Sequence, residues 1–176
     1  TVSRLPALPS ADPSYLLPGA RSLVTVMVAF DYDIVDRYLA KEDHDGLTRH
    51  ETDLYRRLHR ITGELTRHLR RAGYRTACIG KWHLGHGEPA HLPTRHGFER
   101  FVGISGGCVD YYTHRYAFLS DWYRGEAQVV QEGYATDLLT DAAVEFLDEQ
   151  AGDAPFLLYL AYTAPHYGKS IEGDPA

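Results

Sequence analysis

The stretch RTACIGKWHLG, residues 75–85, decides the fold class, because a predicted strand over residues 75–80 leads directly into a turn that carries polar side chains. Two apolar runs lie far from it along the chain: residues 22–30 (SLVTVMVAF) and residues 156–162 (FLLYLAY). Short runs of this composition are typical of buried strands that are covered on both faces. The sequence therefore predicts three strands, two of them buried.

Two predicted amphipathic helices separate these strands. The first begins at the capping box Thr48-Arg49-His50-Glu51, in which hydroxyl and carboxylate each bind a free amide, and it ends at Gly73. The second begins at Thr136 as the N-cap and runs to about residue 150, followed by Gly152. Apolar residues recur at helical spacing: Leu54, Leu58, Ile61, Leu65, Leu69 and Ala72 in the first helix, and Leu138, Leu139, Ala142, Ala143, Phe146 and Leu147 in the second.

The alternation of strand, helix, strand, helix, strand predicts an α/β domain with a partial, mainly parallel sheet and flanking helices. Ligands of such sheets bind beyond the carboxyl ends of the strands. Lys81 and His83 follow one predicted strand, and His166 follows another. A lysine supplies a fixed cation for an anionic ligand, and a histidine donates protons near neutral pH. These three residues are therefore candidates for anion binding and proton transfer.

Composition and charge exclude several classes of protein. Of 176 residues, 44% are hydrophobic and 24% charged, as in globular domains. Residues 1–75 carry twelve basic and ten acidic side chains, whereas residues 76–176 carry six and fourteen, which argues against nucleic-acid binding by the second half. The apolar runs are far shorter than the roughly 20 residues of a membrane span. We therefore expect no membrane partner. Residues 1–18 show no signal peptide, and the sequence does not indicate a cellular compartment.

The two cysteines, Cys78 and Cys108, are too few for a disulfide framework. Neither belongs to a CxxC or iron–sulfur pattern. The redox compartment therefore stays undecided.

Four motifs between residues 69 and 166 stand in a recognisable order. They are LRRAGYRTACIGKWHLG, HGFERFVGISGGCVDYYTH, EGYATDLLTDAAVEFLDEQ and PFLLYLAYTAPH. This internal segment resembles the sulfatase family of the alkaline-phosphatase-like superfamily. The resemblance implies that the chain carries a fragment of an alkaline-phosphatase-like domain.

The resemblance also implies roles for three residues. It makes Lys81, His83 and His166 candidate substrate-binding residues, and His83 and His166 candidates for acid catalysis. It implies hydrolysis of sulfuric esters, with a sulfated small molecule or glycan as substrate. It further implies calcium as a cofactor, although its ligands are not identifiable in this sequence.

The sequence departs from the family in its nucleophile and its metal ligands. Sulfatases convert a Cys or Ser to formylglycine where Pro or Ala follows two places on and Arg four places on, and this sequence has no such motif. The family's calcium site takes an Asp pair after the first strand. Asp31 and Asp33 follow a predicted strand but are separated by Tyr32, and we expect a surface turn there. We therefore expect a truncated family member with little or no turnover.

Residues 1–68 resemble the N-terminal part of epoxyqueuosine-reductase-like iron–sulfur proteins, through PGARSLVTVMVAFDYD and RHETDLYRRLHRITGELTRHL. The cluster cysteines of those proteins are missing here. We therefore predict two parts, residues 1–72 and residues 73–176, joined near Gly73. A non-catalytic fused remnant that at most binds anions or metal is the alternative to a sulfatase.

Several smaller patterns have a functional and a structural interpretation. His83, His86, His91 and His96 are a possible zinc set, but no cysteine accompanies them. Residues 168–170 lack the spacing of a phosphate-binding loop. We expect Gly103, Gly106 and Gly107 to form a tight loop, and Tyr111, Tyr112 and His114 to pack within the chain rather than line a pocket. Sheet edges that a missing strand would cover predict self-association.

Overall fold

The computed structural model describes residues 29–150 and 154–168. Most of the strand predicted over residues 22–30 lies outside these residues, and its last two residues, Ala29 and Phe30, are not in a strand. The elements in chain order are helices α2 (Asp33–Leu39) and α3 (Gly46–Arg71), strand β1 (Arg75–Lys81), 3-10 helices η2 (Pro89–His91) and η3 (Pro93–His96), strands β2 (Arg100–Ile104), β3 (Arg115–Tyr116), β4 (Leu119–Ser120), β5 (Tyr123–Arg124) and β6 (Ala127–Gln128), helix α4 (Ala135–Asp148) and strand β7 (Phe156–Ala161).

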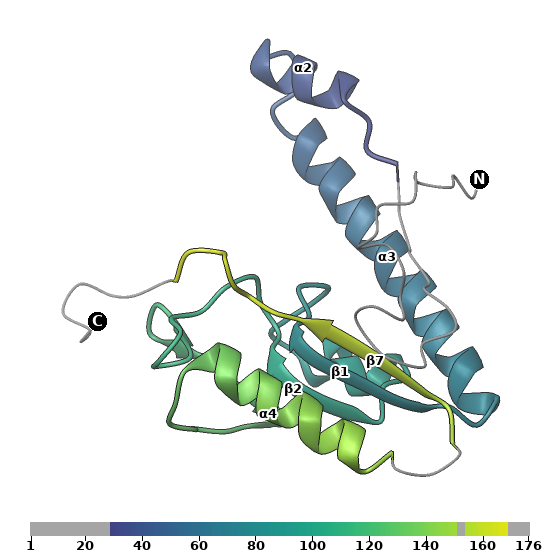
Figure 1. Ribbon diagram of the computed structural model, residues 1–176. Coiled ribbons are helices and arrows are strands. Elements are labelled where there is room, and N and C mark those ends of the chain that lie inside the picture. The colour runs from purple at the N-terminus through teal and green to yellow at the C-terminus, as the bar shows by residue number, and fades with distance from the viewer. Residues whose placement is uncertain (1–28, 151–153, 169–176) are drawn as a thin grey trace, which may run out of the picture.

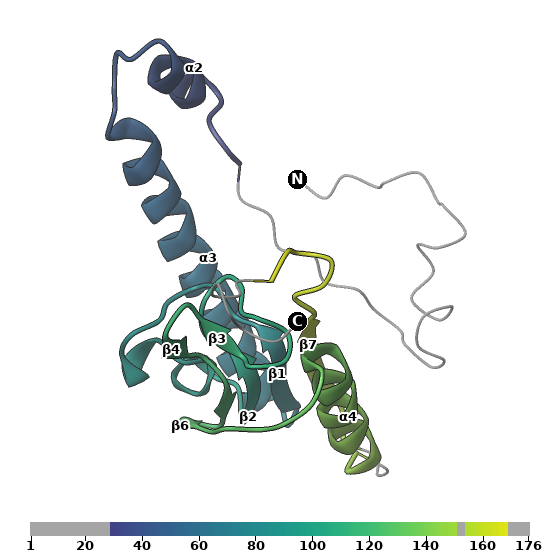
Figure 2. The same cartoon turned by 90° about the vertical axis from the view of Figure 1, so that its left-hand side faces the viewer.

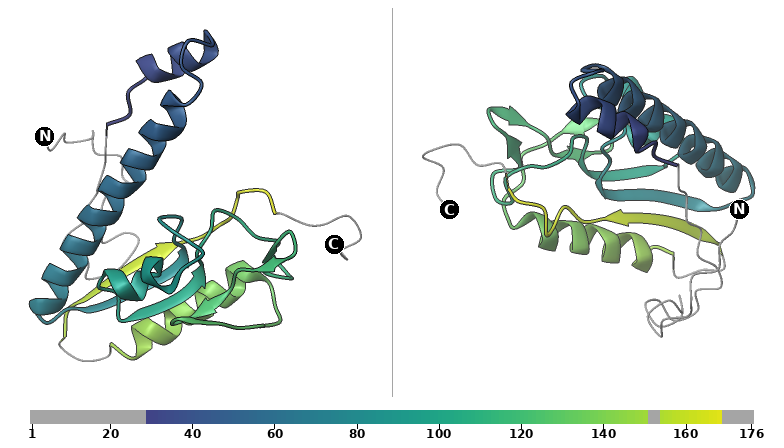
Figure 3. Two further views of the ribbon diagram at one scale, coloured as in Figure 1. Left: turned by 180° about the vertical axis from the view of Figure 1, so that it is seen from behind. Right: turned by 90° about the horizontal axis from the view of Figure 1, so that it is seen from above.

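A five-stranded sheet in the order β6-β5-β2-β1-β7 forms the centre of the described structure. Strand β1 pairs in parallel with both β2 and β7, whereas β5 and β6 add an antiparallel edge. Helices α3 and α4 lie on opposite faces of this sheet (Figure 1 and Figure 3). The prediction of an α/β fold with a mainly parallel sheet and flanking helices is confirmed.

Helix α4 covers the better-packed face. Its residues Leu139, Ala142 and Phe146 are almost fully buried against β1 and β2, as the apolar periodicity predicted. The opposite face has a smaller core around Cys78, Trp82, Leu92, Phe98 and Phe101. Helix α3 is less well covered, because its predicted apolar positions are half-buried or exposed.

Helix α3 extends well beyond the sheet, with α2 near its far end (Figure 2). Its contacts with the sheet and with η3 involve the half that contains Gly63 and Thr66, which are buried. No helix among the described residues is long and apolar enough to cross a membrane.

The predicted helix starts were wrong by one or two residues. Helix α3 begins at Gly46, where the Asp43 carboxylate accepts the Gly46 amide hydrogen at 2.9 Å, so Thr48 lies inside the helix and forms no capping box. Residues 33–39, which no predicted helix or strand covers, form α2. Helix α4 begins at Ala135, and Thr136 is not its cap. The predicted stop is confirmed, because Gly73 follows α3 in the left-handed conformation with φ of 88°.

Strand β7 is not buried as its composition predicted. It is the last strand at one edge of the described sheet, and no described strand pairs with its outer side. Tyr159 and Leu160 are 42% and 39% exposed. Apolar composition indicated a strand correctly but could not tell an edge from a centre.

Candidate functional site

The three candidate residues lie at one edge of the sheet. Lys81 is the last residue of β1, His83 follows two positions later, and His166 comes after β7, the parallel neighbour of β1. Lys81 and His166 are both among the positive charges that lower the pKa of His83, so the three side chains share one electrostatic neighbourhood. We call Lys81, His83 and His166 the rim.

Two glycines allow the strands to pair closely right up to the rim. A side chain on Gly80 would collide with the carbonyl oxygen of Ala161 on β7, and one on Gly103 would collide with the carbonyl oxygen of Gly80. Both glycines have positive φ angles, a region that other residues rarely adopt. The close approach of β1, β2 and β7 places their carboxyl ends side by side.

Lys81 carries an uncompensated positive charge at the rim. Its side chain is half-buried, and its backbone lies opposite Ile104 of β2. Within residues 29–150 and 154–168, its ammonium group forms no hydrogen bond or ion pair. This cation is therefore available to an anionic ligand.

His83 is held in an unusual backbone conformation. Its φ is 53°, and its amide donates a hydrogen bond of 3.2 Å to the carbonyl of Ser105. The ring lies 5.8 Å from the ring of Tyr55, and a side chain on Gly107 would come within 2.7 Å of its Nε2. Partial desolvation of the ring, followed by the charge of Lys81, lowers the pKa of His83. His83 is therefore neutral at pH 7 and gains its proton only in acid.

His166 is oriented by its own loop and by Tyr111. Its amide donates to the carbonyl of Thr163 at 2.9 Å, and the Tyr111 hydroxyl donates to the His166 carbonyl at 2.6 Å. The ring Nδ1 lies 2.9 Å from the carbonyl oxygen of Tyr167. Since a carbonyl oxygen only accepts, Nδ1 carries the hydrogen and Nε2 remains for a ligand.

The glycine-rich loop after β2 is organised by a buried carboxylate. Asp121 accepts hydrogen bonds from the Ser105 amide at 2.9 Å, the Ser105 hydroxyl at 2.7 Å and the Gly106 amide at 2.8 Å. These donors are therefore already used by the protein. The predicted tight loop is confirmed for Gly106 and Gly107, whereas Gly103 lies within strand β2. No sequence pattern had indicated Asp121.

Neither cysteine is exposed at the rim. Cys78 is completely buried in β1, and burial raises the pKa of its thiol. Cys108 is 7% exposed. A thiol without a stabilised thiolate or solvent access is a poor nucleophile.

The acidic residues near the start of the described chain form a turn at the surface. The Asp31 side chain accepts the Asp33 amide hydrogen at 3.1 Å, and the Asp31 amide donates to Nε2 of His50 on α3. Both carboxylates are exposed. This surface turn agrees with the interpretation made from the sequence.

The four histidines of the possible zinc set do not gather around one point. His83 belongs to the rim, whereas the ring of His96 lies 3.7 Å from the ring of His59 on α3. His91 and His96 contact backbone carbonyls of their own segment, those of His86 and Ala90. In the part of the chain that the structure describes, no group of three or more His, Cys, Asp or Glu side chains is arranged to hold a metal ion.

The three aromatic residues after Cys108 differ in their surroundings. His114 is 2% exposed and stacks on Trp122 with 4.3 Å between ring centroids, so the prediction of packing is confirmed for it. Tyr111 packs against Tyr134 and bonds to the loop of His166. Tyr112 is 60% exposed and lines a cavity, contrary to the prediction.

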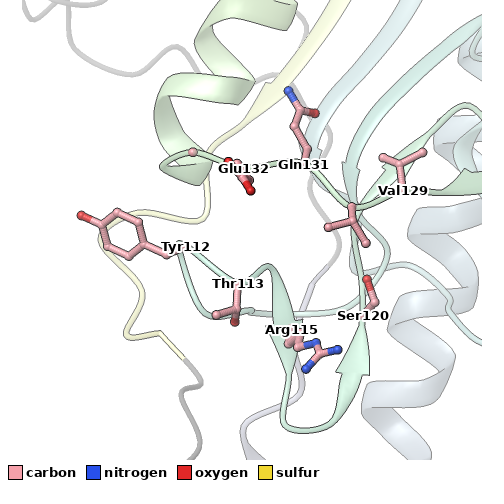
Figure 4. Close-up of a pocket in the computed structure, with 9 residues that line it drawn as sticks. Tyr112, Thr113, Arg115, Ser120, Val129, Gln131 and Glu132 are labelled. Carbon is pink, nitrogen blue, oxygen red and sulfur yellow. The ribbon is translucent and has the colours of Figure 1, made fainter. Parts of the chain in front are cut away.

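Two cavities border this region. The first, of about 340 Å³, has Tyr112, Arg115 and Glu132 among its lining residues (Figure 4), although most of its lining is apolar. The second, of about 390 Å³, lies between α3 and β7 and is mostly apolar, with Tyr55, Trp82, His83 and Tyr159 among its lining residues. Of the three rim residues, only His83 lines either cavity, and it lines the second.

Comparison with known proteins places this geometry in a family. The family model described as Sulfatase matches residues 41–175. The chain is 38% identical over 100 residues to an N-acetylglucosamine-6-O-sulfatase of Bacteroides thetaiotaomicron, covering 56% of this chain and 16% of that protein. It is 36% identical over 111 residues to arylsulfatase J of Mus musculus, covering 58% and 18%. The chain thus spans about a fifth or less of the length of these relatives.

A comparison with solved structures points to the same family as these relatives. A structure of Ps i-CgsB in complex with k-i-k-neocarrahexaose is 32% identical, with a TM-score of 0.51 over 58% of this chain and 26% of that chain. The described part is a partial alkaline-phosphatase-like domain. Because the family model matches well over half of its residues, the chain belongs to the sulfatase family.

Proposed function

We propose that the chain binds a sulfate ester at the rim and, by itself, turns it over slowly or not at all. The observation that carries this proposal is the ammonium group of Lys81, unpaired among the described residues, near His83 and His166 at the carboxyl edge of parallel strands. A sulfate monoester is a compact anion with several oxygen acceptors. A fixed cation and two imidazoles match that charge and those acceptors.

The ligand class that we propose is a sulfated saccharide. The relatives include an N-acetylglucosamine-6-O-sulfatase, and the similar structure of Ps i-CgsB holds a neocarrahexaose. The names of these proteins support a sugar as the part of the ligand that carries the sulfate. The particular sugar depends on contacts away from the rim.

The two histidines would act on the sulfate differently. Among the described residues, Nε2 of His166 has no hydrogen-bond partner, so this nitrogen is available to a sulfate oxygen. His83 is neutral at pH 7, because its pKa is lowered by desolvation and by Lys81. A sulfate beside His83 favours the charged form of that ring and opposes the lowering of its pKa, so sulfate binding should strengthen as the pH is lowered.

Hydrolysis needs more than this rim supplies. A nucleophile must attack sulfur, the bond from sulfur to the ester oxygen must break, and the departing oxygen must take up a proton. His83 and His166 are proposed as donors of that proton. Cys78 and Cys108 are buried, and neither lies in a formylglycine motif. Loss of a nucleophile ordinarily removes most of the rate, which supports little or no turnover.

Calcium, which the family implies, does not fit the described residues. The exposed pair Asp31 and Asp33 lies at the start of α2, away from the sheet, and Asp121 is occupied by Ser105 and Gly106. Calcium requires six or more oxygen ligands around one point. We therefore assign no step of the proposed function to calcium.

The proposal is tested by titrating the purified 176-residue chain with inorganic sulfate and by assaying turnover of an aryl sulfate, with and without added calcium. Lys81→Ala and His166→Ala should each weaken sulfate binding about tenfold. Lys41→Ala, an exposed lysine at the end of α2, is the matched control and should bind as the parent does. Equal binding by all four proteins would refute the rim, and turnover that depends on Lys81 would refute the expectation of inactivity.

A further inference from the structure

Strand β7 forms one edge of the sheet, and no described strand pairs with its outer side (Figure 1). The Pro155 carbonyl accepts the Arg75 amide hydrogen at 2.9 Å, so the odd-numbered residues of this segment are those whose backbone groups bond to β1. The even-numbered residues of the strand direct their N–H and C=O groups outward: Phe156, Leu158 and Leu160. The outer side of β7 therefore presents a row of backbone donors and acceptors.

This edge lacks the features that commonly keep edge strands from pairing with another chain. Such features are lysines, prolines, inward-pointing charges and bulges. Residues 156–164 contain no charged residue and no proline. The side chains of Tyr159, Leu160 and Tyr162 are 42%, 39% and 38% exposed. The edge thus combines free backbone groups with exposed apolar side chains.

The flank of α4 next to this edge is also apolar in part. The Thr140 hydroxyl lies 2.8 Å from the Tyr162 hydroxyl, so Thr140 is on the side of α4 that faces the end of the strand. Val144 lies one turn further along the same flank and is 50% exposed. The exposed apolar surface therefore extends from the strand onto the helix.

The strand is complementary to a second copy of itself. Antiparallel pairing of two copies about Tyr159 sets Leu158 opposite Leu160 of the second copy and Phe156 opposite Tyr162 of the second copy. Leu158 and Leu160 both direct their backbone groups outward, so in this register they exchange hydrogen bonds. The register uses the whole apolar run 156–162, and aromatic and aliphatic pairs across strands stabilise such a sheet.

We propose that two copies of this chain associate through antiparallel pairing of β7 with β7, centred on Tyr159, to form one sheet across the pair. A second copy fits this edge because it brings an uncharged strand whose apolar residues match in reverse order. The contact is short, so it belongs to the smaller and more transient class of interface. Paired strands of opposite direction place the two rims at opposite ends of the joined sheet, so association leaves each rim open to its ligand.

Sedimentation equilibrium of the full 176-residue chain, over about a hundredfold range of concentration, measures this association. The average mass should rise from that of one chain toward that of two. Leu160→Lys puts a charge on the apolar edge and should weaken the dimer at least about tenfold. Leu160→Pro removes an N–H that β1 does not use, so it should also weaken the dimer and leave the chain folded. Val130→Lys, at a 95% exposed position after β6 at the other edge, is the control and should associate as the parent does.

Cysteine cross-linking measures the register. In the proposed pairing Tyr159 lies opposite itself, with about 4.5 Å between the two Cα atoms, which suits a disulfide. Leu157 lies opposite Ala161 of the second copy, so the two copies of Leu157 are about 13 Å apart. Tyr159→Cys should therefore form a covalent dimer when an oxidant is added, whereas Leu157→Cys should not. Cys78 and Cys108 are buried and do not compete.

Each result supports the pairing or overturns it. A single-chain mass at every concentration would overturn it, and so would a dimer that Leu160→Lys weakens no more than Val130→Lys does. Equal cross-linking of Tyr159→Cys and Leu157→Cys would overturn the register on which the pairing depends. Circular dichroism checks that each variant is folded, and if Leu160→Pro unfolds the chain, Leu160→Lys and the cross-links decide.

Discussion

Replacing Asp121 with alanine should destabilise the chain by about 3 kcal/mol. The substitution removes the acceptor of the Ser105 amide, the Ser105 hydroxyl and the Gly106 amide. A buried polar group that loses its partner costs about 1–3 kcal/mol, and Ser105 is only 3% exposed. Gly106 is half-buried, so water can reach its amide and the total should lie well below the sum of three full penalties.

Two further variants show which donors account for the loss. Ser105→Ala removes the hydroxyl and leaves both amides bonded to Asp121, so it should cost about 1 kcal/mol. Asp141→Ala, an exposed position in the middle of α4, should change the free energy of unfolding by less than about 0.5 kcal/mol.

Urea denaturation followed by tryptophan fluorescence measures these differences, because Trp82 and Trp122 are both buried and report loss of the native packing. A loss of about 3 kcal/mol corresponds to a fall in Tm of roughly 6–12 °C for a chain of this length. If Asp121→Ala and Asp141→Ala unfold at the same urea concentration, the carboxylate does not hold the loop and the reasoning fails.

Three more measurements test the core and the histidines. Phe146→Ala should lower the free energy of unfolding by about 3–5 kcal/mol in urea, because the ring is 2% exposed; a loss below 1 kcal/mol would contradict the packing of α4. Lys81→Ala should raise the pKa of His83 in an NMR titration, since it removes a nearby positive charge; an unchanged or lower value would separate the two residues. His59 has a pKa of about 4, lowered chiefly by desolvation, so below about pH 6.5 the unfolded chain takes up a proton that the folded chain does not. Stability should therefore decline between about pH 6.5 and pH 4; His59→Phe should weaken this decline in urea midpoints, His44→Phe should not, and equal slopes in both would argue against the burial of His59.

The sequence predicted those elements whose signals lie within a few neighbouring residues or along one face of a helix. Residues 75–80 form a strand and Gly73 ends α3, because strand composition and a left-handed glycine are visible without knowledge of distant contacts. The buried face of α4 follows from its helical spacing in the same way. Lys81 and His166 follow two strands that pair in parallel, and the rule that such strands place their carboxyl ends together makes both residues candidates for one site.

The errors arose where two neighbouring residues suit the same position or where a distant residue decides the outcome. Asp43 rather than Thr48 supplies the acceptor at the start of α3, and both have side chains suited to that position. The exposure of β7 depends on its place in the strand order, which its own residues do not encode. Asp121 holds a loop sixteen positions away, and a single aspartate between β4 and β5 gives no periodic signal.

Helix α3 is longer than strand β1, so its two ends should differ in their resistance to local unfolding. Twenty-six helical residues extend about 39 Å, whereas the seven residues of β1 extend about 23 Å, so the first turns of α3 have no sheet beneath them. The amides of these turns should exchange with solvent deuterium through local opening, whereas those around Gly63 and Thr66 should exchange only when the sheet itself unfolds. One continuous helix thus belongs to two cooperative units, and its outer end can melt while the rim stays assembled.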